Sequence, residues 1–275
     1  MKNLLHDIFV VLILAFLMTG ISSCSDSMPE SGTIEVSFTA EFPDDVYSRA
    51  SNGELTVNTL VVGIYDAHTL EEIGNRHYFS ISQMNFDITL TLAKDQEYSL
   101  VFWAYNANQS IYDINNLRAI EMKAFPMFTT LEQAEYSDAF FAVKENMKVA
   151  AGRNHSIKMV RPLARINIGT TGSLMQASFT AIGVPTTFCP FTKSMKGTSD
   201  FTWNYNLSSE EHFWVDDNEY NYLAMAYVFA PDSEPTQIEA KLTLKEDDSF
   251  MTIEIPEVIV QANHQTNITG NINFN

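Results

Sequence analysis

Apolar and polar residues alternate along a short stretch near the start of the chain. The apolar positions are Ile34, Val36, Phe38 and Ala40, and polar residues separate them. A period of two is typical of a β-strand with one buried face. The sequence therefore predicts a strand over 34–41, which ends at the turn-forming Pro43.

The same strand signal recurs along most of the remaining chain. Further strands are predicted at 56–65, 86–92, 98–105, 139–143 and 157–160, and then at 163–168, 177–182, 223–229, 238–244, 251–255, 258–261 and 267–272. The polar run 245–248 predicts a hairpin tip, whereas 111–135 lacks alternation and predicts a long connection with a helical turn at 131–134.

This pattern predicts an all-β protein. Two consecutive blocks of short strands are typical of two tandem antiparallel β-sandwiches. We expect an N-terminal sandwich over 33–160 and a C-terminal sandwich over 161–275.

The first 23 residues have the pattern of an export signal. Residues 8–18 form an unbroken apolar run of eleven residues, shorter than the roughly 20 that a membrane-spanning helix needs. Small residues then precede Cys24, and this stretch resembles a bacterial lipobox. The resemblance implies a lipid on Cys24 that anchors the chain in the outer membrane, with 24–32 as a polar tether. The alternative is an ordinary signal peptide followed by an incidental cysteine.

Charge and cysteine content exclude several classes of protein. The chain has 16 Lys and Arg against 34 Asp and Glu, which gives a net charge of −18. A nucleic-acid partner would require a basic stripe, so none is expected. Cys24 and Cys189 are the only cysteines, so a disulfide framework and a cysteine-rich zinc site are excluded. Cys189 is expected to be a buried, inert thiol.

One aromatic window is a candidate ligand patch. Within 201–222 the candidate contact residues are Trp203, Tyr205, Trp214 and Tyr220. Aromatic faces beside polar groups suit stacking on sugars from host or bacterial glycans. The alternative, which we favour, is that these rings fill the core of the second sandwich. The acidic run 216–219 is interpreted as a solvated turn, because it lacks the donor spacing of a calcium loop.

The sequence contains no recognised catalytic signature. HExxH, GxSxG, phosphate-cradling and dinucleotide-binding motifs are all missing. We therefore expect a protein that is not an enzyme, with no catalytic residues, no metal site and no cofactor.

Several landmarks, taken in order, resemble the fimbrillin-like lipoproteins of Bacteroidales. They are the lipobox, TIEVSFTAEF, YSRAS, VFWAY, RPLARINIGT and the closing QTNITGNINF. The resemblance implies two transthyretin-like β-sandwiches and a subunit of a cell-surface type V pilus. It also implies that a trypsin-like protease cuts the bond between Arg49 and Ala50. The cut would release the lipid together with the strand over 34–41.

Removal of this first strand would have a definite physical consequence. Burial of its apolar side chains is worth about 5–9 kcal/mol at roughly 1.5–3 kcal/mol for each large one, and its loss would uncover a sheet edge. Another fimbrial subunit would fill the gap by β-strand addition. The alternatives are that Arg49 is an ordinary loop arginine, and that the protein is a lipid-anchored adhesin or glycan-binding protein that does not polymerise. In the family that the chain resembles, stalk subunits carry their donor strand as a C-terminal extension, whereas this sequence stops at Asn275, directly after a predicted strand of the second sandwich. A role as an anchor, as a tip or as a surface lipoprotein that never polymerises therefore stays open beside a role in the stalk.

Overall fold

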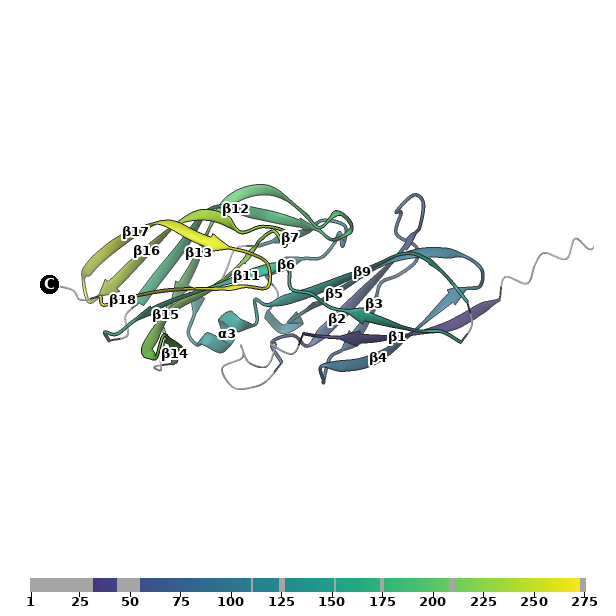
Figure 1. Cartoon of the computed structure of the whole chain (residues 1–275), viewed down its shortest axis with the longest axis horizontal. Coiled ribbons are helices and arrows are strands. Elements are labelled where there is room, and N and C mark those ends of the chain that lie inside the picture. The colour runs from purple at the N-terminus through teal and green to yellow at the C-terminus, as the bar shows by residue number, and fades with distance from the viewer. Residues whose placement is uncertain are drawn as a thin grey trace, which may run out of the picture.

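The computed structural model describes residues 32–43, 55–109, 111–123, 127–150, 152–173, 176–207 and 211–272. Two β-sandwiches lie end to end along the long axis of the molecule (Figure 1). The predicted all-β fold class is therefore confirmed. Within the described ranges, no helix is long and apolar enough to cross a membrane.

The first sandwich is built from two sheets. One sheet has the order β3 (His77–Ser80), β2 (Thr59–Asp66), β5 (Glu97–Tyr105) and β9 (Ala139–Lys148). The other has the order β10 (Asn154–Lys158), β1 (Thr33–Glu41) and β4 (Asn85–Ala93). Their facing side chains, among them Phe38, Leu90, Phe102 and Phe140, form a separate hydrophobic core.

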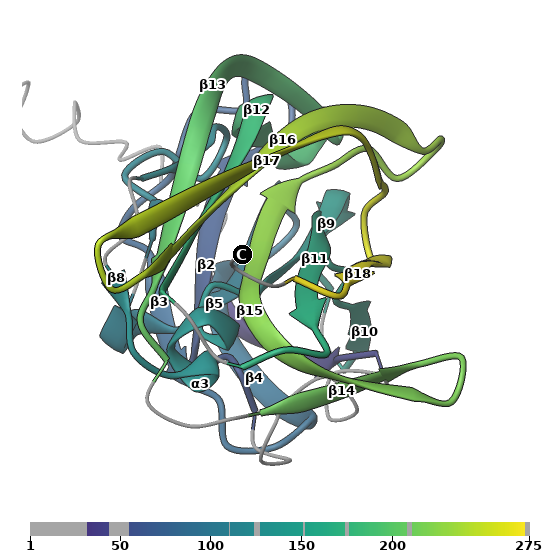
Figure 2. The same cartoon turned by 90° about the vertical axis from the view of Figure 1, so that its left-hand side faces the viewer.

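The second sandwich has the same two-layer plan, seen end-on in Figure 2. Its smaller sheet has the order β14 (His212–Val215), β15 (Asn218–Phe229), β11 (Leu163–Thr170) and β18 (Gln265–Gly270). Its larger sheet has the order β17 (Ser249–Val260), β16 (Thr236–Glu246), β12 (Gln176–Cys189), β13 (Ser194–Tyr205) and β8 (Met127–Phe128). Two short strands, β6 (Tyr112–Asp113) and β7 (Ile120–Met122), pair with each other, and β7 also pairs with β12.

The long connection between β5 and β9 belongs structurally to both sandwiches. It contains the short 3-10 helix η1 (Ala107–Gln109) and the predicted helical turn, α3 (Leu131–Glu135), which begins after Thr130, whose side chain caps the Gln133 amide. Its strands β7 and β8 pair with β12 and β13 of the second sandwich. The division of the chain at 160/161 stays a prediction, and hydrogen bonds cross it.

The sheet that contains β5 is buried on both faces. Phe102 packs in the core of the first sandwich, whereas Trp103 faces the other way and joins the core of the second. Across this junction the rings of Phe141 and Phe188 meet edge to face, with centroids 4.5 Å apart. A large apolar interface opposes independent domain motion, so the two sandwiches pack as one unit.

Most predicted strands are present, with informative exceptions. β3, β13 and β14 were not predicted, and neither were the short strands β6, β7 and β8, which lie in the stretch 111–135 that was expected to be a connection. The predicted strands 251–255 and 258–261 are one strand, β17. β17 contains Pro256 but is the last strand of its sheet, and its register to β16 shifts between Ile238 and Ala240. Proline is tolerated at such an edge and bulge because its missing N–H breaks no ladder bond.

Candidate functional site

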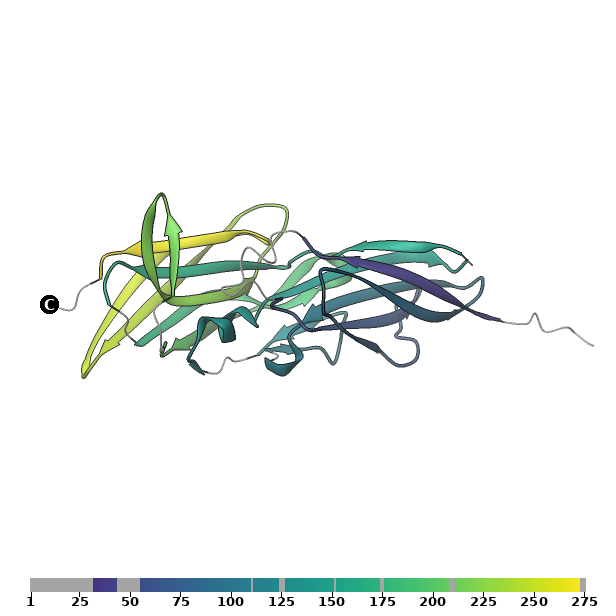
Figure 3. The same cartoon turned by 90° about the horizontal axis from the view of Figure 1, so that it is seen from below.

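The first strand is the central strand of its sheet. β1 pairs antiparallel with β4 along all nine of its residues, from Thr33 to Glu41. On its other side it runs parallel to β10 from Ser37 to Glu41. Figure 3 shows this strand, in purple, running along the length of the first sandwich. We expected its removal to uncover one sheet edge, and the structure shows that removal would uncover two, on β4 and on β10.

Alternate side chains of β1 enter the core of the first sandwich. Val36, Phe38 and Ala40 have exposed fractions of 1%, 0% and 0%, whereas Ile34, at the start of the strand, is only half-buried. The Phe38 ring lies 5.6 Å from that of Phe102, measured between centroids. Val36 and Phe38 together contribute about 3–6 kcal/mol at roughly 1.5–3 kcal/mol each.

The outward-facing side chains of β1 form polar contacts with both neighbouring strands. The Thr39 hydroxyl donates to Asp87 of β4 at 2.5 Å and accepts from the Asn154 amide of β10 at 3.0 Å. The Ser156 hydroxyl of β10 donates to the Glu41 carboxylate at 2.7 Å. These exposed bonds fix the register of β1 but each adds little stability, because water competes for the same groups.

A histidine on β10 faces a fully buried residue of β1. The rings of His155 and Phe38 stack with centroids 5.4 Å apart and planes 28° apart. Partial burial, with the nearby charges of Lys144 and Arg153, lowers the pKa of His155 below its usual value. Protonation of His155 therefore opposes the packing that holds β1 in its sheet.

The predicted processing and lipidation residues lie outside the described residues. Arg49 and Ala50 fall in 44–54, between β1 and the start of the next described segment, and Cys24 falls in 1–31. Both remain predictions from the sequence.

A buried ion pair links the two sandwiches beside this site. Arg161 donates to both carboxylate oxygens of Asp138, at 2.7 and 2.9 Å, and to the Asn263 side chain at 2.7 Å. Its guanidinium also lies 4.6 Å from the centroid of the Phe140 ring. The side chains of Arg161 and Asp138 are 0% and 1% exposed. The role of Arg161 in this pair could not be predicted from the local sequence, because its partners lie 23 and 102 positions away.

A second buried arginine lies within β11. Arg165 donates to Asn167 on the same strand and to the Tyr222 hydroxyl on β15, both at 2.9 Å. One of its nitrogens lies 3.9 Å from a carboxylate oxygen of Glu135 in α3. Burial raises the pKa of Tyr222, so this phenol stays neutral and remains available as a hydrogen-bond partner for the arginine.

The aromatic window does not form one surface patch. Trp203 and Tyr205 have exposed fractions of 0% and 1% and lie in the core of the second sandwich. Tyr220 is half-buried against the same core, whereas Trp214 is 64% exposed. The alternative interpretation, that these rings are mainly core, describes Trp203 and Tyr205 correctly.

Trp214 lies on the hairpin that the acidic run closes. Val215 of β14 pairs with Asn218 of β15, so Asp216 and Asp217 form a two-residue turn. Both have positive φ, 48° and 63°, as the mirror-image hairpin turns require. The predicted solvated turn at 216–219 is confirmed. Within the described part of the chain no group of three or more metal-ligating side chains occurs, and Cys189 is a buried free thiol.

Solved structures with a similar fold include several fimbrial proteins. A fimbrial assembly protein from Parabacteroides distasonis matches at 12% identity with a TM-score of 0.50, and the match covers 87% of this chain and 92% of that protein. The tip fimbrial protein Mfa3 from Porphyromonas gingivalis matches at 12% identity with a TM-score of 0.47, covering 88% and 96%. The fimbrial anchor protein Mfa2 of the same species matches at 12% identity with a TM-score of 0.43, covering 84% and 83%. The all-β sandwich fold that the fimbrillin-like resemblance implied is confirmed by the strands and sheets of this chain and by the match to the fimbrial assembly protein.

Among curated proteins, none matches this sequence. A protein family described as a family of unknown function (DUF6562) matches residues 29–272, which include every described strand. The chain therefore belongs to this family of unknown function.

Proposed function

We propose that this protein is a subunit of a cell-surface fimbria, exported as a lipoprotein and opened for assembly by cleavage after Arg49. The cut would leave β1 without a covalent link to the rest of the fold, since 44–54 is the segment that joins them. A strand from a neighbouring subunit would then replace β1. The central position of β1, between β4 and β10, is the observation that carries this proposal.

A central strand that can leave creates a specific binding site. Its departure would free one row of backbone groups on β4 and another on β10, and it would empty the space that Val36 and Phe38 fill. An incoming strand with apolar residues at alternate positions would satisfy both rows and refill the core. The fold shared with a fimbrial assembly protein supports a role of this kind.

Limited proteolysis of the mature lipoprotein in detergent tests the proposal. A trypsin-like protease should produce one new N-terminus at Ala50, and the clipped protein should form ladders of stable multimers. Arg49→Gln should prevent both results. Arg153→Gln is the matched control, because Arg153 is an exposed arginine beside β10 and its loss should change neither result. Cleavage elsewhere, or a clipped protein that stays monomeric, would contradict the proposal.

Membrane attachment through Cys24 has its own test. Mass spectrometry of the N-terminal peptide should show an acylated cysteine, and Cys24→Ser should move the protein out of the outer-membrane fraction. An unmodified Cys24 in membrane-bound protein would exclude a lipid at this position without affecting the strand-exchange test.

A second candidate function is an adhesin that does not polymerise. The observation in its favour is Trp214, an exposed aromatic residue beside the Asp216–Asp217 turn. If this hairpin binds glycans, Trp214→Ala should abolish binding to a glycan array. Phe250→Ala is the matched control, because Phe250 is equally exposed on another hairpin, between β16 and β17. Loss of binding in both variants, or in neither, would count against this function.

A further inference from the structure

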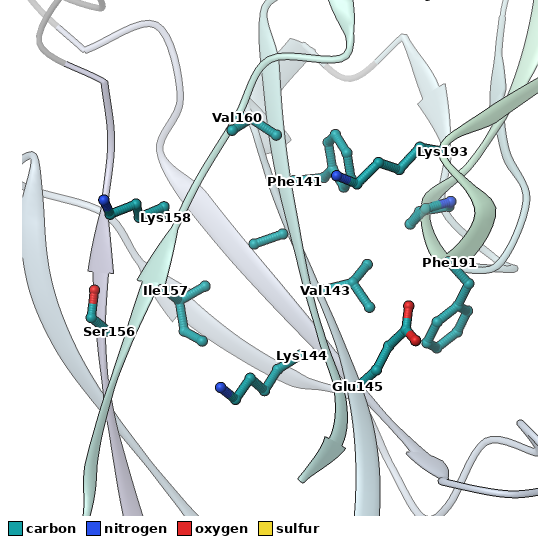
Figure 4. Close-up of a pocket in the computed structure, with 12 residues that line it drawn as sticks. Phe141, Val143, Lys144, Glu145, Ser156, Ile157, Lys158, Val160, Phe191 and Lys193 are labelled. Atoms are coloured by element: carbon teal, nitrogen blue, oxygen red, sulfur yellow. The ribbon is translucent and has the colours of Figure 1, made fainter. Parts of the chain in front are cut away.

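Two edge strands of the first sandwich face each other without pairing along most of their length. β9 is the last strand of one sheet and β10 is the last strand of the other. A single bridge joins them, in which the backbones of Phe141 and Val160 exchange hydrogen bonds of 2.8 and 2.9 Å. Figure 4 shows the two strands close together beside Val160 and separating toward Ser156 and Glu145.

The space between these strands is a cleft with a volume of about 570 Å³. Its apolar lining comes from Ala142 and Val143 of β9, Ile157 of β10, and Phe191. Phe191 belongs to the short 3-10 helix η2 (Pro190–Thr192) of the second sandwich, and its ring meets Tyr65 edge to face at 5.3 Å. Both sandwiches therefore line the cleft, the first through β9 and β10 and the second through η2.

The backbone along the cleft has unused hydrogen-bonding groups. Because these groups alternate sides along a strand, the orientation of Phe141 toward β10 gives Val143 the same orientation. Ser156 and Lys158 of β10 likewise share the orientation of Val160, while the backbone N–H of Met159 points the other way and donates to the carbonyl of Glu41, the last residue of β1. Within the described residues β9 pairs in a ladder only with β5, and β10 only with β1. Unpaired edges of this kind are templates for an additional strand.

The charge around the cleft is opposite to that of the whole chain. Lysines 144, 158 and 193 line it with one acidic residue, Glu145, in a chain of net charge −18. Figure 4 shows Lys144 extending toward Ile157 and Lys193 extending toward Phe141. In the described part of the chain neither of these two lysines has an ion-pair partner. The local charge favours an acidic occupant.

We propose that the β9–β10 cleft binds an extended acidic peptide segment by strand addition. The peptide backbone pairs with the free groups of Val143 and Lys158, and one of its apolar side chains rests on Ile157. Its carboxylates are attracted to the ammonium groups of Lys144 and Lys193, whose long side chains line the cleft. The cleft exists with β1 in place, so this binding does not depend on the proposed exchange of β1.

A peptide titration tests the cleft directly. The probe is a fluorescein-labelled synthetic heptapeptide of alternating glutamate and valine, and fluorescence anisotropy reports its binding to the intact mature protein. Lys144→Glu and Lys193→Glu should each weaken binding about tenfold or more, since each replaces an attraction with a repulsion. Lys196→Glu is the matched control, because Lys196 is an exposed lysine on β13 outside the cleft. It should bind like the wild type.

A further variant separates strand addition from simple charge attraction. Val143→Pro removes one backbone donor without changing charge and should also weaken binding, with circular dichroism used to confirm that the variant is folded. If Val143→Pro does not fold, the two lysine variants still decide the result. Failure of the wild type to bind the acidic peptide would overturn the proposal, as would equal binding of a lysine–valine heptapeptide. Binding of a uronic-acid oligosaccharide without binding of the peptide would also overturn it.

Discussion

The first strands of the two sandwiches occupy equivalent positions but differ in how firmly they are held. β1 lies between antiparallel β4 and parallel β10, and β11 lies between antiparallel β15 and parallel β18. All eight residues of β11 are buried, whereas only three of the nine residues of β1 are buried. Although the two strands have equivalent neighbours, β11 is therefore packed on both of its faces, whereas β1 is packed on only one. This difference in burial supports the proposal that β1, and not β11, is the strand that is exchanged.

The largest loss of stability is expected from breaking the buried ion pair of Arg161, which lies just before β11. Asp138→Ala leaves the buried Arg161 without its carboxylate, and loss of one partner of a buried pair costs about 3–5 kcal/mol. Urea unfolding should show this loss across the whole molecule, because the pair joins both sandwiches. A loss below about 1 kcal/mol would mean that the junction does not depend on this pair.

Core truncations in the two strands should separate local from global stability. Phe38→Ala should cost about 3–5 kcal/mol and Ile166→Ala about 2–5 kcal/mol, from lost burial and the cavities left behind. Hydrogen exchange should show that Phe38→Ala speeds exchange in β1 and β4 and leaves β11 protected. Ile166→Ala should lower protection throughout the chain. Equal effects of both variants on every strand would remove the distinction between β1 and β11.

Acid should loosen β1 by a smaller amount. The pKa of His155 is lowered in the folded protein, so the state with β1 displaced binds protons more readily. The contribution of His155 to holding β1 is therefore complete above its ordinary pKa of about 6.5 and is lost as the pH falls through and below that value. After cleavage at Arg49, the fragment 24–49 should dissociate faster at pH about 5.5 than at about 7.5.

His155→Gln is the control for this pH effect, because glutamine does not titrate. Faster release at acid pH that persists in His155→Gln would assign the effect to another group.

The smallest loss of stability is expected at an exposed ion pair that belongs to neither strand. Lys241 and Glu254 lie 3.2 Å apart with side chains 46% and 65% exposed. Exposed pairs contribute about 0–1 kcal/mol, so Lys241→Ala should change urea stability by less than that. A larger change would show that surface charge shapes the stability of this acidic chain more than burial does.

Sequence patterns predicted strands with at least one apolar face, including the fully buried β11, and missed strands such as β13 that begin with mostly exposed residues. Apolar and polar residues alternate clearly in β1 and β4, so this period of two was sufficient to predict both strands. β13 begins with a mostly exposed polar run from Ser194 to Asp200, which has no apolar face to detect. β17 was divided in two because Pro256 resembles a strand end, and only the edge position of β17 explains its presence there.

The contacts that organise the site could not be predicted from local pattern. Arg165 and Asn167 lie in a fully buried strand, and they are satisfied by Tyr222 and Asn267, which come from distant strands. Likewise the order of residues along the chain does not predict that β9 and β10 lie side by side and remain unpaired along most of their length. Such features depend on how the sheets pack against each other, and this packing is determined by contacts between residues that are far apart in the sequence.

The orientation of β1 has a mechanical consequence. The strand lies along the long axis of the molecule (Figure 1) and has bonded neighbours on both sides. If the protein is held by its N-terminal end while a load acts on the rest, the pull runs along the strand and loads its backbone hydrogen bonds in shear. These bonds must then break together, whereas a force directed across the strand would break them one after another. The intact chain would therefore resist a pull along β1 better than a pull across it.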